Sequence, residues 1–291
     1  MTRNIVKRAI PAGLSGLAAT LFTCGTAQAI DIHPGDYTVL PEGTNLALVY
    51  GVHIDADELE VGGRSVPDSS LQATFTMLRY VRFEKIGDVP VLAEAILPVG
   101  GYHDVKVGGV PQPTRNGLGD LILAVAAFPV HGKATTLGFT AYLTAPTGAY
   151  DPARISFGTN SYSFTPQVGW IQRLDEGLYL DAAADVAFAT SHSEGALRYS
   201  TAPSYQLQAY IRKALNATTS LSFGYSGRFG GRQKIDGGGV GLKTNSHQIR
   251  AFAGRFVTKT LQVQLMAGAD VDSDDGFRQG FQGQLRLLKL F

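Results

Sequence analysis

The chain has 291 residues, of which 17% are charged, and a formal net charge of +1 at pH 7. The charged fraction lies below the roughly 25% that is usual in soluble domains, and the 35 glycines argue against a helical bundle. A net charge so close to zero gives no indication of a nucleic-acid partner. This composition favours an all-β chain with many turns and closely packed strands, such as one large barrel.

Residues 1–29 have the features of a cleaved signal peptide, which leaves residues 30–291 as the mature domain. Three basic residues among the first eight precede an apolar stretch, and Ala27-Gln28-Ala29 has the small-x-small pattern of a cleavage site. The mature chain is therefore expected to begin at Ile30. An uncleaved anchor is an alternative, but the apolar stretch is too short to span a bilayer comfortably.

The only cysteine of the chain, Cys24, lies within the expected signal peptide. A lipoprotein signal ending at Cys24 is a second alternative, although Phe22 and Thr23 are bulky for that motif. Once residues 1–29 are removed, the mature chain has no cysteine, so that neither a disulfide nor thiol chemistry is expected.

Twelve segments alternate apolar and polar residues with a period of two, which is typical of half-exposed strands. Their lengths are close to the roughly 9–11 residues that a tilted membrane strand needs. The segments are 45–54, 71–84, 90–99, 118–128, 136–144, 162–172, 178–189, 204–214, 220–229, 247–256, 261–270 and 281–291.

The connections between these segments alternate strictly in length. The long ones are 55–70, 100–117, 145–161, 190–203, 230–246 and 271–280, and short ones separate them. Bacterial outer-membrane barrels have long outer loops, short periplasmic turns and an even number of strands. No run of 18 apolar residues occurs in the mature chain, so a barrel is the expected way to cross a bilayer. A soluble sandwich gives no reason for loops sorted by length. The pattern predicts an antiparallel transmembrane β-barrel of about 12 strands with periplasmic N- and C-termini.

The last predicted strand ends on the final residue, Phe291. A soluble chain usually trails a polar tail after its last strand. This ending resembles the closing strand of an outer-membrane barrel, where it acts as a signal to the barrel assembly machinery. Lys289 departs from the usual apolar pattern, but its long side chain can reach the lipid headgroups from a position so near the end.

Seven stretches spread over the mature chain form a distinctive set. They are DYTVLPEGTNL (36–46), LRY (78–80), GLGD (117–120), APTGAYD (145–151), PSYQLQAY (203–210), TNSH (244–247) and LRLLKLF (285–291). Together they resemble the family named for the meta-pathway of phenol degradation. This resemblance implies a transporter in the outer membrane of a Gram-negative bacterium, with aromatic or other hydrophobic compounds as solutes. It implies no particular binding residues.

The polar faces of the predicted strands are expected to line a lumen. Acidic and basic side chains lie on different halves of the predicted wall. The acidic residues are Glu94, Asp120, Asp181 and Asp185, and the basic ones are Arg212, Arg228, Arg286 and, if its strand faces inward, Arg250. One hypothesis is a constriction crossed by a transverse electric field. The alternative is that these side chains pair across a closed lumen, since twelve strands lie between the filled eight-stranded barrels and the open porins.

No residue pattern predicts a catalytic, cofactor or metal site. Gly117-Leu118-Gly119-Asp120 lacks the later glycine and the helix that a phosphate-binding loop requires. The histidines have no metal-site spacing, and the two histidines that adjoin serines cannot form a dyad with a strand neighbour that faces the opposite way. Residues 30–41 are too short for a plug domain or an energy-coupling segment.

The sequence therefore predicts a channel for passive uptake of small molecules, with lipid and a small solute as partners. A structural or surface-interaction barrel with a closed lumen is the main alternative. A lipid-hydrolysing barrel is a third.

Overall fold

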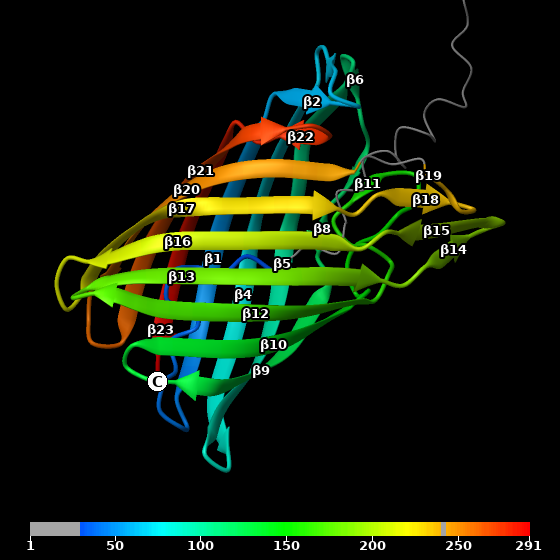
Figure 1. Cartoon of the computed structure of the whole chain (residues 1–291). Helices are drawn as coiled ribbons and strands as arrows, with labels where there is room; N and C mark the ends of the chain where they lie inside the picture. Colours follow the sequence, from blue (N-terminus) through cyan, green and yellow to red (C-terminus); the bar gives the residue numbers. More distant parts are fainter. Residues whose placement is uncertain (1–29, 240–242) are drawn as a thin grey trace, which may run out of the picture.

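The computed structural model describes residues 30–239 and 243–291, in which twelve long antiparallel strands close into a barrel (Figure 1). All twelve predicted strands are present. They are β1 (Asn45–Ala56), β4 (Ser70–Ile86), β5 (Val89–Val107), β9 (Leu121–His131), β10 (Thr135–Ala145), β12 (Ser163–Asp175), β13 (Leu178–Ala189), β16 (Ser204–Ala214), β17 (Thr219–Gly230), β20 (Thr244–Phe256), β21 (Leu261–Ser273) and β23 (Phe281–Leu290). The described residues contain no helix long and apolar enough to cross a membrane.

The C-terminal strand β23 closes the barrel, as its sequence pattern predicts. It pairs with β21 on one side and with β1 on the other, from Leu46 opposite Leu290 to Asp55 opposite Phe281. The Asn45 amide also donates to the Phe291 carbonyl at 3.0 Å. Each of the twelve long strands therefore has a paired neighbour on both sides.

The two ends of the barrel differ in their connections. At the end where β23 finishes, the strands are joined by the short turns 87–88, 132–134, 176–177, 215–218 and 257–260. We call this the short-turn end and the opposite end the long-loop end (Figure 1). The connections at the long-loop end carry short strands of their own. These are β2 (Glu58–Glu60), β3 (Ser65–Val66), β6 (Val110–Pro111), β7 (Thr114–Arg115), β8 (Gly117–Leu118), β11 (Ile155–Ser156), β14 (His192–Glu194), β15 (Leu197–Thr201), β18 (Gln233–Ile235), β19 (Gly238–Gly239) and β22 (Gly276–Arg278).

Strands β4 and β5 form a hairpin that runs beyond the barrel wall into the region predicted as the loop 100–117. The alternation of the sequence breaks at Gly100 and Gly101, which is why the pattern appeared to end there. A side chain at Gly100 would overlap Phe75, and one at Gly101 would overlap Asn116. The two glycines therefore let strand pairing continue where a larger residue would not fit.

Outward-facing side chains form an apolar belt, as a lipid-facing surface requires. Val125, Phe139, Phe223 and Leu265 are all more than half exposed. On β12 to β23 many inward positions are polar, as predicted. On β1 and β4 the prediction of a polar interior is wrong, because Leu46, Leu48, Tyr50 and Val52 of β1 and Val81 and Phe83 of β4 point inward and are buried.

Candidate permeation pathway

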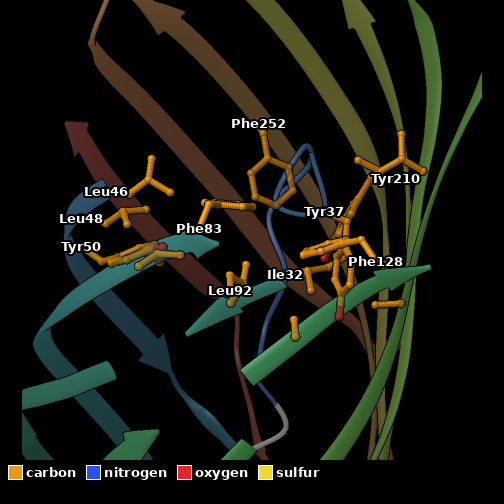
Figure 2. Close-up of a cluster of buried hydrophobic side chains, with 14 of the residues drawn as sticks. Ile32, Tyr37, Leu46, Leu48, Tyr50, Phe83, Leu92, Phe128, Tyr210 and Phe252 are labelled. Atoms are coloured by element: carbon orange, nitrogen blue, oxygen red, sulfur yellow. The ribbon is translucent and has the colours of Figure 1, made fainter. Parts of the chain in front are cut away.

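The N-terminal segment, residues 30–41, lies inside the barrel, and we call it the plug. Ile32 and Tyr37 are buried among side chains from the strands, including Phe83, Phe128 and Phe252 (Figure 2). The sequence predicts that residues 30–41 are too short for a plug domain, and it does not predict that the segment would nevertheless lie inside the barrel. A domain is not needed, because the barrel interior itself supplies the apolar partners.

A tight turn folds the plug into a compact shape. His33-Pro34-Gly35-Asp36 has proline and glycine at the two central positions, which favours a type II turn. The Asp36 amide donates to the His33 carbonyl at 3.0 Å, and Gly35 has the positive φ of +93° that this turn requires. The Asp36 carboxylate in turn accepts a hydrogen bond from the His33 amide at 3.1 Å.

Ion pairs hold Asp36 at the centre of the barrel. Arg286 Nη1 of β23 lies 2.7 Å from Asp36 Oδ1, and Arg79 Nη1 of β4 lies 3.4 Å from Oδ2. Arg79 also pairs with Glu94 of β5 at 2.6 Å. The plug thus ties β23 to the hairpin of β4 and β5, which is distant from it in the sequence. Burial alone would raise the pKa of Asp36, but the two arginines lower it below the usual range, so this carboxylate stays charged.

Further polar contacts fix the rest of the plug. Asp31 pairs with Arg250 at 3.0 Å, and the Gly35 amide donates to Asp181 at 3.0 Å. Asp181 also pairs with Arg212 at 2.8 Å. The Tyr37 hydroxyl donates to Gln167 and shares a hydrogen bond with Thr140, both at 2.9 Å. These contacts give hydrogen-bond or ion-pair partners to polar groups of the plug and to the strand residues that face them.

The eight predicted lumen residues have different surroundings. Six of them are buried inside the barrel: Glu94, Asp120, Asp181, Asp185, Arg250 and Arg286. Glu94, Asp181, Arg212, Arg250 and Arg286 take part in the ion pairs above. Their role in permeation stays a prediction. The sequence reasoning missed the partners Asp31, Asp36 and Arg79, and the turn motif at 33–36 was the one local signal for them.

Asp120 and Arg228 lie nearer the long loops. Asp120 accepts hydrogen bonds from the Gly148 amide at 2.8 Å and from the Thr159 amide at 2.9 Å, and so holds the loop between β10 and β12 in place. Arg228 is half-buried and lines the outer cavity.

The outer cavity, of about 340 Å³, occupies the barrel interior on the long-loop side of the plug. Its floor includes Ile30, Asp31 and His33. One wall is apolar and comes mainly from β1, β4 and β5, with Val52, Ile54, Leu71, Phe75, Met77 and Ile96. The rest of the lining is more polar, with Ser163, Arg228, Ser246 and Gln282 among its residues. A cavity of roughly 150 Å³ already holds a benzene ring, so the volume suits a monoaromatic compound.

Acid pH is expected to loosen the plug through His33. Burial, with a contribution from Arg286, lowers the pKa of His33 to about 4, against the opposing effects of Asp36, Asp31 and Gln264. A released His33 would take up its proton near pH 6.5. Docking is therefore at full strength above about pH 6.5 and loses up to about 3 kcal/mol as the pH falls toward 4.

The measurement is the ionic current through single barrels in a planar bilayer between pH 7 and pH 4. We expect the open fraction to rise on acidification. His33→Gln keeps a hydrogen-bonding group beside Gln264 but does not titrate, and it should abolish the rise. An unchanged acid response in this variant would assign the effect to another group.

The closed barrel, the apolar belt and the interior cavity define a transmembrane β-barrel of the outer-membrane type. A family model described as "Putative MetA-pathway of phenol degradation" matches residues 55–287, and the chain belongs to this family. The resemblance inferred from the sequence motifs is confirmed. A search of curated proteins found no match.

Solved structures give a concordant result. The chain is similar to the COG4313 outer membrane channel from Pseudomonas putida F1, with 26% identity, a TM-score of 0.81 and coverage of 90% of this chain and 100% of that chain. More distant matches include a TodX monoaromatic hydrocarbon channel mutant and a KdgM porin.

 The TodX match has 9% identity, a TM-score of 0.48 and coverage of 89% of this chain and 91% of that chain. The KdgM structure, in complex with disordered oligogalacturonate, has 8% identity, a TM-score of 0.44 and coverage of 84% and 99%.

Proposed function

We propose that the protein is an outer-membrane channel of a Gram-negative bacterium that admits small aromatic or other apolar molecules by passive diffusion. The observation that carries this proposal is the outer cavity, which has one apolar wall while the rest of its lining is more polar. Such a cavity suits a ring that bears one polar group. The similar Pseudomonas putida protein is an outer membrane channel, and the family is named for phenol degradation.

The route runs from the long-loop end, which faces the outside, toward the short-turn end, which faces the periplasm. A solute that enters the outer cavity exchanges water for the side chains of β1, β4 and β5. Below the cavity, Ile32 and Tyr37 fill the interior together with residues of the strands. Onward passage therefore requires the plug to shift. The energy comes from the concentration gradient of the solute alone.

The test compares two neighbouring residues of β4 that face opposite ways. Phe75 lines the outer cavity, whereas Thr76 is exposed on the outside of the barrel. We expect Phe75→Ala to weaken phenol binding by about fivefold, because an aromatic contact is worth about 1 kcal/mol beyond its burial. Thr76→Ala should leave binding unchanged.

Binding is measured by calorimetry on the detergent-solubilised barrel. Uptake is measured as the oxidation of added phenol by a phenol-oxidising enzyme enclosed in proteoliposomes. Uptake by the wild type and a parallel loss of both signals in Phe75→Ala would support the channel. Equal uptake in empty and protein-containing liposomes would instead favour a structural barrel with a closed lumen.

We also propose that β23 is the segment that the barrel assembly machinery recognises. Phe291 is 63% exposed at the end of the closing strand, and its ring lies 6.4 Å from that of Tyr80. Deletion of Phe291 should lower the amount of folded barrel in the outer membrane about tenfold, measured by heat-modifiable migration of membrane fractions. Deletion of an exposed loop residue such as Val61 serves as the control. Normal levels without Phe291 would contradict the proposal.

A further inference from the structure

Among the described residues, four buried side-chain oxygens have no hydrogen-bond donor. Two of them, Oδ1 of Asp185 and Oε1 of Gln206, belong to neighbouring residues, and the other two belong to Glu94 and Gln282. Asp185 and Gln206 are 8% and 2% exposed and lie opposite each other on the paired strands β13 and β16. A buried acceptor without a donor costs about 1–3 kcal/mol, and more if it is charged. This pair is therefore expected to have a donor group in the mature protein.

Both residues are connected to the first residues of the plug. Gln167 Nε2 donates to Asp185 Oδ2 and to the Ile30 carbonyl, each at 3.0 Å. Gln206 Nε2 donates to the Asp31 carboxylate. The two unpartnered acceptors thus belong to residues that are linked by hydrogen bonds to Ile30 and Asp31, the first two residues of the plug.

The charges around this point are unbalanced. Asp31 pairs with Arg250, which is the one cation within ion-pair distance of it among the described residues. None of the ion pairs between described residues includes Asp185. A buried carboxylate is usually paired with a cation. A group with a positive charge and more than one N–H donor would satisfy both Asp185 and Gln206.

We propose that Asp185 and Gln206 form a binding site for a primary ammonium group, and that its ligand is the chain's own α-ammonium at Ile30. The proposal rests on cleavage after Ala29. Before cleavage, the nitrogen of residue 30 is a neutral amide with a single hydrogen. Hydrolysis of the Ala29–Ile30 peptide bond adds water and converts that nitrogen into an ammonium with three donors and a positive charge. Signal removal would thereby lock the plug in place.

The experiment measures the pKa of the α-amine in the folded mature barrel. The N-terminal peptide is first identified by mass spectrometry, and the rate of its acylation by an amine-reactive ester is then followed from pH 6 to pH 10. Asp185→Asn is compared with Asp181→Asn, which removes a buried carboxylate from the same face of β13 that contacts the plug at Gly35. Heat-modifiable migration confirms that each variant is folded.

An ion pair with Asp185 raises the pKa of the α-amine above its ordinary value of about 8, whereas burial alone lowers it. We expect a raised value in the wild type and in Asp181→Asn, and a fall of at least about one unit in Asp185→Asn, a tenfold change in the proton equilibrium. The other nearby charges, Asp31 of the plug, Arg250 of β20 and Arg228 of β17, are common to all three proteins.

Three results would overturn the proposal. The first is a mature chain that does not begin at Ile30. The second is an α-amine pKa that is not raised in the wild type. The third is an α-amine pKa that is equal in the wild type and in Asp185→Asn. An α-amine that resists acylation to the same extent in both proteins would overturn the proposal in the same way. If the wild-type amine does not react and that of Asp185→Asn does, the proposal is supported. Because no solute is involved, these outcomes are independent of the proposed channel activity.

Discussion

Deletion of residues 30–41 is expected to raise the single-channel conductance by at least about tenfold, because twelve strands enclose more space than their own side chains fill. The plug contributes Ile32 and Tyr37 to the buried cluster, and its Asp31 and Asp36 pair with Arg250 and Arg286. Without the plug these two arginines lose their carboxylate partners. The enlarged pore should therefore also favour anions. The measurement is conductance and reversal potential in a planar bilayer under a salt gradient.

A synthetic peptide with the sequence of residues 30–41 provides the control for this deletion. Added to the truncated barrel, it should restore the low conductance, and a peptide with Asp36 replaced by Asn should do so less well. A truncated barrel that stays silent would show that strand side chains such as Phe83 and Phe128 close the lumen without the plug.

The strands were predictable because a strand in a membrane wall repeats its pattern every two residues. Each segment carries that signal in its own sequence, whatever its neighbours are. The closure of β23 on β1 followed from the even strand count and the terminal Phe291. The extension of β5 to Val107 was not predicted, because Gly100 and Gly101 interrupt the pattern although they do not interrupt the pairing.

The interior was less predictable, since it depends on which residues meet across the barrel. Glu94 and Arg286 could be assigned to the lumen from the side of the strand on which they lie. Their link through Arg79 and Asp36 joins residues that are far apart in the sequence. Apolar residues inside β1 look the same in the sequence as residues that face lipid, because both environments exclude water. Only the position of the plug and the outer cavity distinguishes the two faces.

Gly169→Ala is expected to displace the plug with a single added methyl group. The Tyr37 ring lies against Gly169 of β12 and Gly138 of β10, which are opposite each other in the paired strands. A Cβ at either glycine would overlap this ring. Tyr37 would have to leave its position and lose its hydrogen bonds with Thr140 and Gln167.

The expected cost of Gly169→Ala is about 3 kcal/mol of plug docking, similar to the loss of a buried aromatic side chain, which shifts the docked-to-released ratio more than a hundredfold. The open fraction in a planar bilayer should rise accordingly. Gly51→Ala is the matched control, because a Cβ at this outward glycine of β1 would meet nothing within 4 Å. Tyr37→Gly in the Gly169→Ala background separates the two causes of opening. If Tyr37 is the group displaced, removing its ring adds no further opening, whereas a further rise would mean that the methyl group acts on the barrel wall.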